Sequence, residues 1–414
     1  MNVINHTYSL PHVQQISCPP VWRAWDGLAA AYAPAFLWRE RAGQEVVLAL
    51  GAAGVYSSLT ECRKALASDH GAPLAFGMVA FDPRSILLAP WEGFQSSLFV
   101  VPKVLVRWKD GIASIWGQEK ALADVVDALQ NPPPPRRLLD VDGGRAFSEA
   151  EWTKAVRAMQ AHIAAGAITK AVLARDSIRE SAAPVQAGYV LERLASSTPD
   201  CYLFAHGMNG ATFLGASPER LFRLDRSMVE TESLAGTRPR GKTAREDERL
   251  AQELLHSAKE NIEQNIVTQF LQQGLAELCV AVSDDLEPHV RKLAGLQHLH
   301  TRIHGQLKDN VTPDDVLHAL HPTPAVCGMP KEQAREIIAE LEPVPRGLYA
   351  GAIGWMDAER AELAVAIRSA LLKDRVARVF AGAGIIAASD AKAEWRETAL
   401  KMKPMLSALN CEEL

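Results

Sequence analysis

The sequence contains no Cys-x-x-Cys pair, and its cysteines do not have the spacing of a zinc site. The six cysteines are spread over 414 residues, at positions 18, 62, 201, 279, 327 and 411. Scattered cysteines of this kind are typical of proteins that stay in a reducing compartment. We therefore expect free thiols and a cytoplasmic location.

Long apolar runs are also missing. No uncharged apolar stretch approaches the ~20 residues that a membrane-spanning helix needs, and the first residues lack the basic-then-apolar order of a signal peptide. A G-x-x-x-x-G-K-[ST] loop is absent, and the glycines at 382 and 384 end a strand pattern without the G-x-G-x-x-G order that opens a helix. These absences disfavour a membrane protein and a phosphate-loop enzyme.

Neither sign of charge is in large excess. The formal net charge is −5, with 22% charged and 48% hydrophobic residues. This composition is that of an ordinary globular protein, and it gives no reason to expect nucleic acid or an anionic membrane as a partner. From length alone, two or three domains would be the default expectation.

Two pairs of glutamates lie in helical patterns. Glu394 and Glu397 are followed one turn later by Lys401, and Glu260 and Glu263 repeat the same spacing in a long helical stretch. Residues at i, i+3 and i+7 share one helix face. Two such pairs facing each other would form an anionic oxygen site suited to Mg²⁺ rather than Zn²⁺. The alternative, a solvated helix face, is the commoner case for an isolated E-x-x-E.

The first 130 residues predict mixed strands and helices without a chemical motif. Asp110-Gly111 is a strong hairpin signal. The run 131–137 contains four consecutive prolines, which neither continue a helix nor donate to a sheet. We interpret it as a surface crossover between two halves of one domain, with an inter-domain hinge as the alternative. Strands are expected at 36–39, 45–50 and 74–81, and a helix at 60–67.

A helix and a strand are predicted next. Ser148 and Glu151 form a capping-box pattern at the start of a helix over 147–165, and Ile168–Arg175 alternates as a strand does. Lys170 lies on a strand face that otherwise carries Val and Ala. The local pattern favours an edge-strand lysine that faces solvent, and a functional lysine is the alternative.

Polar residues then follow a predicted hairpin. Strands at 202–206 and 211–215 flank a Met-Asn-Gly turn, and Glu219 follows the second strand, where polar chemistry is often found in sheet proteins. A surface turn residue is the commoner interpretation of such a glutamate. The segment 230–241 is predicted to be a loop, either anion-binding through Gly236, Thr237 and its arginines or simply solvated.

The last part predicts one long helix over 243–278 and an antiparallel meander of strands at 348–356, 363–372 and 376–386. Arg368 lies within the second of these strands among apolar residues. An arginine in that position needs an anion or solvent, which makes it a candidate carboxylate anchor.

Seven motifs occur in a fixed order along the chain. They are SPE at 217–219, ESLAGTRPRG at 232–241, E-x-x-E at 260–263, HPTPAVCG at 321–328, LYAGAIGW at 348–355, AIR at 366–368, and AGAGI at 381–385 followed by EWRETALK. Together they resemble the chorismate-utilising enzymes, which include isochorismate synthase, salicylate synthase and the large subunits of anthranilate and aminodeoxychorismate synthases. The resemblance covers residues ~147–408.

The resemblance implies a fold. The expected class is α+β: a single large domain of the anthranilate/aminodeoxychorismate synthase type, built as a two-subdomain antiparallel β-sandwich flanked by helices, with the active site between the layers. This replaces the length-based expectation of several domains. Residues 1–145 would be the variable N-terminal half of the fold, and residues 146–414 the chorismate-binding catalytic region.

The resemblance also implies a ligand set. Glu263 and Glu397 match the family's Mg²⁺ ligands, with Glu260 and Glu394 as supporting carboxylates. Arg368 and Tyr349 match positions that bind the pyruvyl carboxylate of chorismate, with Gly382 and Lys401 nearby. His298 and the turn Ala235, Gly236 and Thr237 would line the ring.

Lys170 and Glu219 bear on the subfamily. Lys170 matches the lysine found where water is the nucleophile, and Glu219 matches the general acid that protonates the departing C4 hydroxyl. The resemblance thus implies Mg²⁺-dependent conversion of chorismate to isochorismate, an isomerase (hydroxymutase) reaction, by water addition at C2. Salicylate synthase, which shares both residues and then eliminates pyruvate, is the alternative. The small side chains of Ala325 and Val326 favour isochorismate synthase.

Relatives that add an amine provide a contrast. They lack the lysine at the position of Lys170, so no glutaminase partner is expected, and Ala235 stands where one type of aminodeoxychorismate synthase has a nucleophilic lysine. A monomer is expected. The sequence does not distinguish siderophore from menaquinone biosynthesis.

Overall fold

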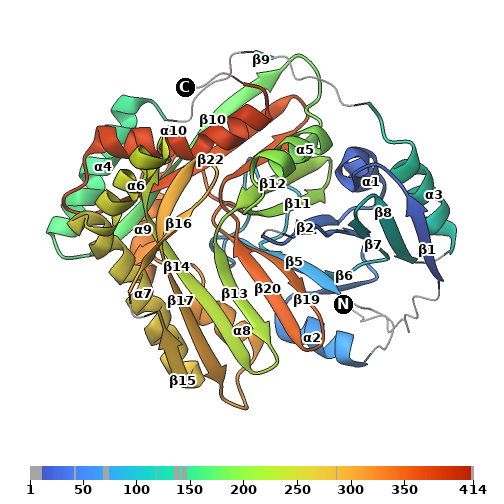
Figure 1. Cartoon of the computed structure of the whole chain (residues 1–414), viewed down its shortest axis with the longest axis horizontal. Coiled ribbons are helices and arrows are strands. Elements are labelled where there is room, and N and C mark those ends of the chain that lie inside the picture. Colours follow the sequence, from blue (N-terminus) through green and yellow to red (C-terminus); the bar gives the residue numbers. More distant parts are fainter. Residues whose placement is uncertain are drawn as a thin grey trace.

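The structure, a computed structural model, describes residues 12–41, 43–68, 74–117, 119–134, 140–141, 147–285 and 287–411. Within these ranges the strands form two antiparallel sheets, of 12 and 10 strands, with helices against their outer sides (Figure 1). The expected α+β sandwich of a single domain is confirmed. Both sheets combine strands from before and after residue 145, which is why the chain does not divide into separate domains by length.

Sheet A contains the N-terminal strands at one edge and the strands of the site at the other. In spatial order its path is β1 (His12–Ser17), β8 (Ile112–Gly117), β7 (Val104–Lys109), β3 (Val46–Leu50), β2 (Ala35–Arg39), β11 (Tyr202–Met208), β12 (Ala211–Ser217), β21 (Ser369–Lys373), β22 (Val376–Ile385), β10 (Lys170–Ser181) and β18 (Gly328–Met329), with β9 (Asp140–Val141) paired to β10.

Sheet B carries the other wall of the site. Its path is β15 (Cys279–Asp284), β17 (Leu296–Leu307), β14 (Met228–Pro239), β13 (Arg220–Asp225), β20 (Arg360–Val365), β19 (Ala352–Met356), β5 (Ala75–Val79), β6 (Ser97–Val101) and β4 (Gly54–Tyr56), with β16 (His289–Lys292) paired to β17. The wall of the site is on β14 and β17, which lie near the edge formed by β15.

Alternating side chains give sheet A two apolar faces. Phe36 on β2 packs toward sheet B, where its ring stacks 6.4 Å from that of Phe76 on β5. Its neighbour Leu37 belongs instead to the second core, which lies under α1, α3, α5 and α10 and includes Trp25 and Met402. Because successive residues of a strand point to opposite faces, a strand buried on both sides is apolar throughout.

The helices are η1 (Val21–Ala24), α1 (Trp25–Ala31), α2 (Leu59–Ser68), α3 (Glu119–Gln130), α4 (Glu149–Ala164), α5 (Ala187–Ser197), α6 (Ala244–Leu255), α7 (Ala258–Leu278), α8 (Pro313–Leu320), α9 (Lys331–Leu341) and α10 (Ala391–Ala408). Helix α10 packs on β22 and α7 packs on β14 and β17. None of the helices in the described ranges is long and apolar enough to cross a membrane.

Three sequence-based elements are wrong, each for a local reason. The segment 230–241 belongs largely to strand β14, because its polar residues find buried partners between β13 and β17. The single helix over 243–278 is two helices, since Ser257 caps the start of α7 by accepting from the N–H of Glu260. The strand over 363–372 is interrupted at 366–368, where the chain crosses from β20 in sheet B to β21 in sheet A.

Other local predictions are confirmed. Ser148 and Glu151 form the capping box of α4, and β11 and β12 form the expected hairpin. Its turn residues Asn209 and Gly210 both have positive φ, which suits Asn-Gly. The proline run lies only partly within the described residues, which stop at 134 and resume at 140.

Candidate active site

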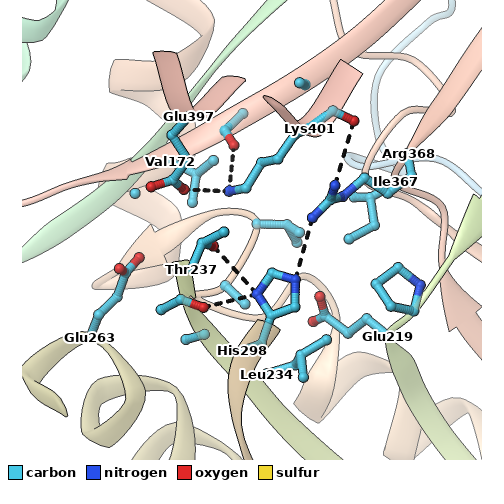
Figure 2. Close-up of a pocket in the computed structure, with 18 of the residues that line it drawn as sticks. Val172, Glu219, Leu234, Thr237, Glu263, His298, Ile367, Arg368, Glu397 and Lys401 are labelled. Carbon is cyan, nitrogen blue, oxygen red and sulfur yellow. Dashed lines mark hydrogen bonds and ion pairs between the residues drawn. The ribbon is translucent and has the colours of Figure 1, made fainter. Parts of the chain in front are cut away.

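A cavity that offers about 70 Å³ to the centres of water molecules lies between the two sheets, beside α7 and α10 (Figure 2). Sheet A contributes β10 and β22, and sheet B contributes β14 and β17. The residues predicted for the site that line this cavity are Glu219, Ala235, Gly236, Thr237, Glu263, His298, Ala325, Tyr349, Arg368, Gly382, Glu397 and Lys401. Three others, Lys170, Glu260 and Glu394, lie outside its lining and form ion pairs next to it.

Lys170 is fully buried at the start of β10. Its Nζ is 2.7 Å from Oε1 of Glu263 on α7. The interpretation as a solvent-facing edge lysine is wrong, because β10 pairs with β22 on one side and β18 on the other. A buried ammonium is stable only beside an anion. Burial alone would raise the pKa of Glu263, but Lys170, followed by Lys401 and Lys259, outweighs it and lowers that pKa.

Glu219 occupies the short connection between β12 and β13 and is 4% exposed. Burial, reinforced by the negative charge of Glu232, raises the pKa of Glu219 to about 8, against the opposing effect of Lys170, Lys401 and Arg368. At neutral pH this carboxyl group is therefore mostly protonated, and it lines the cavity as a proton donor.

Arg368 stands where the chain crosses between the sheets, with a φ of 52°. This left-handed conformation is costly for a residue with a long side chain, and such strain is concentrated at functional sites. Its guanidinium makes only long contacts, 3.5 Å each, to the carbonyl of Lys401 and to Nε2 of His298. Within the described residues Arg368 has no carboxylate partner. The N–H groups of its guanidinium are therefore available to bind an anion in the cavity.

His298 on β17 is held as a neutral ring. Its Nδ1 is 2.8 Å from the carbonyl of Gly236 and 3.3 Å from Oγ1 of Thr237. Burial and then Arg368 lower the pKa of His298 to about 3. Because Nδ1 faces a carbonyl, we place the proton there, which leaves Nε2 as an acceptor toward Arg368. Gly236 itself has a φ of 66° and lies in an irregularity of the β14–β17 ladder.

The four glutamates predicted as metal ligands each have a cationic partner. The pairs are Lys170–Glu263, Lys401–Glu397 and Lys259–Glu394, each at 2.7 Å, and Arg238–Glu260 at 2.9 Å. The Lys259–Glu394 pair joins α7 to α10. In the part of the chain that the structure describes, no three acidic, histidine or cysteine side chains are grouped as a metal site requires.

Glycines of β22 leave room for these groups. A Cβ at Gly384 would lie 1.9 Å from Oε1 of Glu263, and a Cβ at Gly382 would lie 3.2 Å from the hydroxyl of Tyr349. The carbonyl of Gly382 also accepts from Nζ of Lys401 at 2.9 Å. The glycine-rich strand is thus the surface on which Glu263, Tyr349 and Lys401 converge.

A buried ion pair that the sequence did not reveal supports the same wall. Arg346 and Glu342 pair at 2.8 Å through Nε and Oε2. Arg346 also donates to the carbonyls of Val172 and Val326, and Glu342 accepts from the N–H of Ala174. Val172 and Val326 line the cavity, so this pair fixes two of its apolar walls.

Replacing Arg346 with methionine is expected to lower the free energy of unfolding by about 3–5 kcal/mol, because Glu342 would remain buried without its partner. Denaturant unfolding monitored by circular dichroism measures this change. The double variant Arg346→Met/Glu342→Leu, which buries no charge, is expected to recover much of the loss. A single variant within about 1 kcal/mol of the native protein would contradict this assignment.

The sequence pointed to no role for the apolar part of the lining: Leu234, Ile367 and Pro218 lie within the seven motifs but were not singled out, and Val172 lies in none of them. Apolar residues in strands have the same pattern whether they face a core or a cavity, so no local signal separates the two.

Comparison with known proteins agrees with this geometry. A family model described as "Chorismate binding enzyme" matches residues 12–410. The chain is 35% identical over 359 residues to the "Isochorismate synthase MenF" of Bacillus subtilis, covering 82% of this chain and 75% of that protein. It is 36% identical over 313 residues to "Anthranilate synthase component 1" of Bacillus caldotenax, covering 71% and 60%.

A solved structure shows the same architecture. The menaquinone-specific isochorismate synthase MenF from Escherichia coli superposes with a TM-score of 0.82 at 28% identity, over 98% of this chain and 96% of that one. The family model spans nearly the whole chain, and the cavity between the sheets holds the residues on which the resemblance depends. This chain belongs to the chorismate-binding enzymes.

Proposed function

We propose that this chain is an isochorismate synthase, an isomerase (hydroxymutase) that converts chorismate to isochorismate by adding water at C2 and releasing the C4 hydroxyl. The observation that carries the proposal is the placement of two proton-transfer groups around one cavity. Glu219 lines it with a protonated carboxyl group, and Lys170 is buried next to it beside Glu263. Curated isochorismate synthases that cover most of the chain support the same activity.

The two groups account for the proton balance of the reaction. Lys170 first releases its ammonium proton to solvent, and the neutral amine then takes a proton from the attacking water as the new C2–O bond forms. The ring double bonds shift, the C4–O bond breaks, and Glu219 gives its proton to the departing oxygen, which leaves as water. One proton enters the enzyme and one leaves, so returning the proton from Lys170 to Glu219 restores the neutral amine and the protonated acid.

Binding of the substrate would use the remaining polar groups. Arg368 is suited to a carboxylate because its guanidinium has no carboxylate partner in the described chain, and with Tyr349, Gly382 and Lys401 it would bind the pyruvyl carboxylate. His298 and the turn Ala235, Gly236 and Thr237 would bound the ring. Ala325 and Val326 would limit the space beside it.

The chemistry of the four glutamates suits Mg²⁺, and their carboxylates would have to leave their cationic partners to gather around it. Glu263 and Glu397 would hold it, with Glu260 and Glu394 in support, since carboxylate oxygens are its preferred ligands. Gly384 leaves space for the Glu263 carboxylate beside this site, because a Cβ there would lie 1.9 Å from its Oε1. When bound, Mg²⁺ would neutralise and orient the ring carboxylate of chorismate. Its binding competes with the four cations that now pair with these glutamates.

Salicylate synthase remains the second candidate, because it would share Lys170 and Glu219. The small pair Ala325 and Val326 favours the synthase without pyruvate loss. We further propose a cytoplasmic monomer that acts without a glutaminase subunit and supplies a siderophore or menaquinone pathway.

The direct test is incubation of the purified protein with chorismate and Mg²⁺, followed by liquid chromatography. A chorismate–isochorismate mixture without salicylate or pyruvate is expected. Salicylate with an equal amount of pyruvate would establish the second candidate. No reaction unless ammonia or a partner protein is added would overturn both.

The reaction is expected to slow at alkaline pH. Glu219 can donate a proton only while protonated, and its pKa is about 8, so forward kcat/KM should fall as pH rises through about 8. A pH profile of the native protein measures this limb. The Glu219→Gln variant, which cannot titrate there, should be slow and lack the limb. A native profile that is flat through this range would contradict the assignment.

A further inference from the structure

We propose that Glu232 is a positioning residue for Glu219: a buried carboxylate behind the cavity that fixes the backbone on both sides of the acid and supplies the negative charge against which the acid keeps its proton. The role rests on the proposed function, because it gives Glu219 the task of protonating a leaving group. The sequence placed Glu232 in a predicted loop, and nothing in its local pattern pointed to this role.

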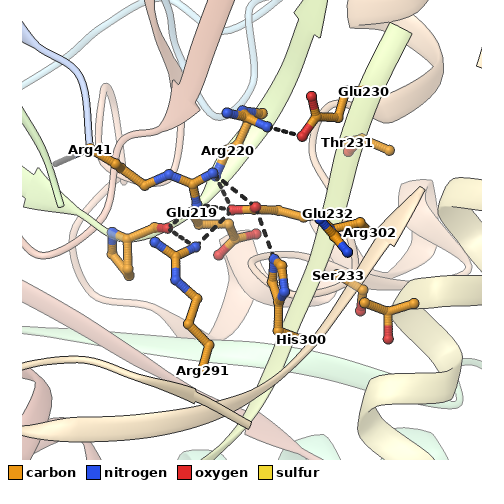
Figure 3. Close-up of polar contacts among 12 residues, drawn as sticks. Arg41, Glu219, Arg220, Glu230, Thr231, Glu232, Ser233, Arg291, His300 and Arg302 are labelled. Atoms are coloured by element: carbon orange, nitrogen blue, oxygen red, sulfur yellow. Dashed lines mark hydrogen bonds and ion pairs between the residues drawn. The ribbon is translucent and has the colours of Figure 1, made fainter. Parts of the chain in front are cut away.

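The carboxylate of Glu232 is enclosed by donors from four parts of the chain (Figure 3). Its residue is 4% exposed on β14. Oε2 accepts from Arg41 and from Nε2 of His300, each at 3.0 Å. Oε1 accepts from the backbone N–H of Arg220 at 2.9 Å and from Arg291 at 3.4 Å. So many donors keep the group ionised.

The same network holds the connection that carries Glu219. The N–H bound by Glu232 belongs to Arg220, the residue after the acid. The carbonyl of Pro218, the residue before it, accepts from Arg41 at 3.0 Å and from Arg291 at 3.2 Å. Both flanking peptide groups are therefore tied to Glu232, one directly and one through its two arginines. The backbone of Glu219 cannot shift without breaking these contacts.

The charge of Glu232 acts in the direction that the acid needs. Cations approach Glu219 from three elements: Lys170 on β10, Lys401 on α10, and Arg368 at the crossover between sheets. Each of them favours the ionised carboxylate. Burial is the largest effect that raises the pKa of Glu219 against these cations, and the negative charge of Glu232 is the second. The groups around Glu232 itself are Arg41, Arg220, Arg291 and His300. Burial alone would raise the pKa of Glu232, but His300 and Arg41 outweigh it and lower that pKa.

Glu232→Gln is the informative variant, because an amide oxygen can still accept from the N–H of Arg220 while the charge is lost. We expect the alkaline limb of kcat/KM to move to lower pH by about 1, as the cations around Glu219 go unopposed. Turnover at neutral pH should fall, with little change in the KM for chorismate, because Glu232 does not line the cavity.

A matched control lies two residues away. Glu230 is on the same face of β14 and pairs with Arg220, but its side chain is 31% exposed. Glu230→Gln removes the same charge from the same strand and is expected to leave the limb in place. Glu232→Asp keeps the charge but is too short to reach the same donors, so it should lower turnover while the limb stays at the native pH.

A spectroscopic titration separates this proposal from the proposed function. The carbonyl stretching band of protonated Glu219, assigned by its loss in Glu219→Gln, should disappear at lower pH in Glu232→Gln than in the native protein, whatever reaction the enzyme catalyses. An unshifted midpoint in Glu232→Gln, or an equal shift in Glu230→Gln, would overturn the proposal. If Glu232→Gln does not fold, Glu232→Asp decides. Unchanged turnover in Glu232→Asp, or an alkaline limb displaced from the native pH in that variant, would overturn the proposal.

Discussion

Replacing Lys170 with alanine is expected to reduce the rate of isochorismate formation by about 10²–10⁴-fold, the usual contribution of a positioned base. Lys170 is the buried amine next to the cavity, but it does not line the cavity and makes its ion pair with Glu263. Chorismate should therefore still bind to Lys170→Ala in the presence of Mg²⁺. Initial rates and calorimetric titration with chorismate measure the two effects separately.

The control for this variant is Lys170→Arg. Arginine keeps a positive charge beside Glu263 but is not deprotonated in proteins, so it cannot act as a base. Both variants should be inactive if Lys170 accepts the proton. Recovery of most of the activity in Lys170→Arg would show that only its charge matters, and more than about a tenth of native turnover in Lys170→Ala would remove the residue from the chemistry.

Replacing Glu397 with glutamine is expected to weaken Mg²⁺ binding and turnover together. A neutral amide binds a divalent cation more weakly than a carboxylate does. Replacing a residue that only hydrogen-bonds to a metal ligand already lowers metal affinity by about 10–100-fold. The Mg²⁺ concentration for half-maximal rate should rise by at least about 10-fold. Calorimetric titration of the protein with Mg²⁺ alone gives a readout that does not depend on turnover. Glu263→Gln should behave in the same way.

Glu253→Gln provides the comparison for both variants. Glu253 is a half-exposed glutamate on α6 that pairs with Arg249, away from the cavity. Its replacement should change neither the Mg²⁺ requirement nor the rate. Full activity of the native protein in excess EDTA would refute the metal assignment regardless of the variants.

The sequence predicted elements well where one local rule was decisive. Ser148 with Glu151, and Asn209-Gly210, are short signals whose physics is local, and both elements formed as expected. The crossover at Arg368 could not be predicted in this way, because residues 363–372 are apolar on both sides of it. Only the presence of two sheets decides that the strand must end and change layers there.

The site shows the same division. Spacing placed Glu260 and Glu263 on one helix face without deciding between a metal site and a solvated face, and the order of motifs gathered most of the lining. Burial is what the sequence could not supply: Lys170 looked like an edge lysine, and Glu232 looked like part of a loop. Both are enclosed because strands distant in the chain pair beside them. Partners of this kind are visible only in three dimensions.

Water from solvent, activated at this site, is expected to become the new hydroxyl group of isochorismate. The most direct measurement is incubation of the protein with chorismate and Mg²⁺ in H₂¹⁸O, with the isochorismate product analysed by mass spectrometry. We expect a single ¹⁸O in isochorismate, at its C2 hydroxyl. Unlabelled isochorismate would mean that the hydroxyl moves within the substrate, and would contradict the roles of both Lys170 and Glu219.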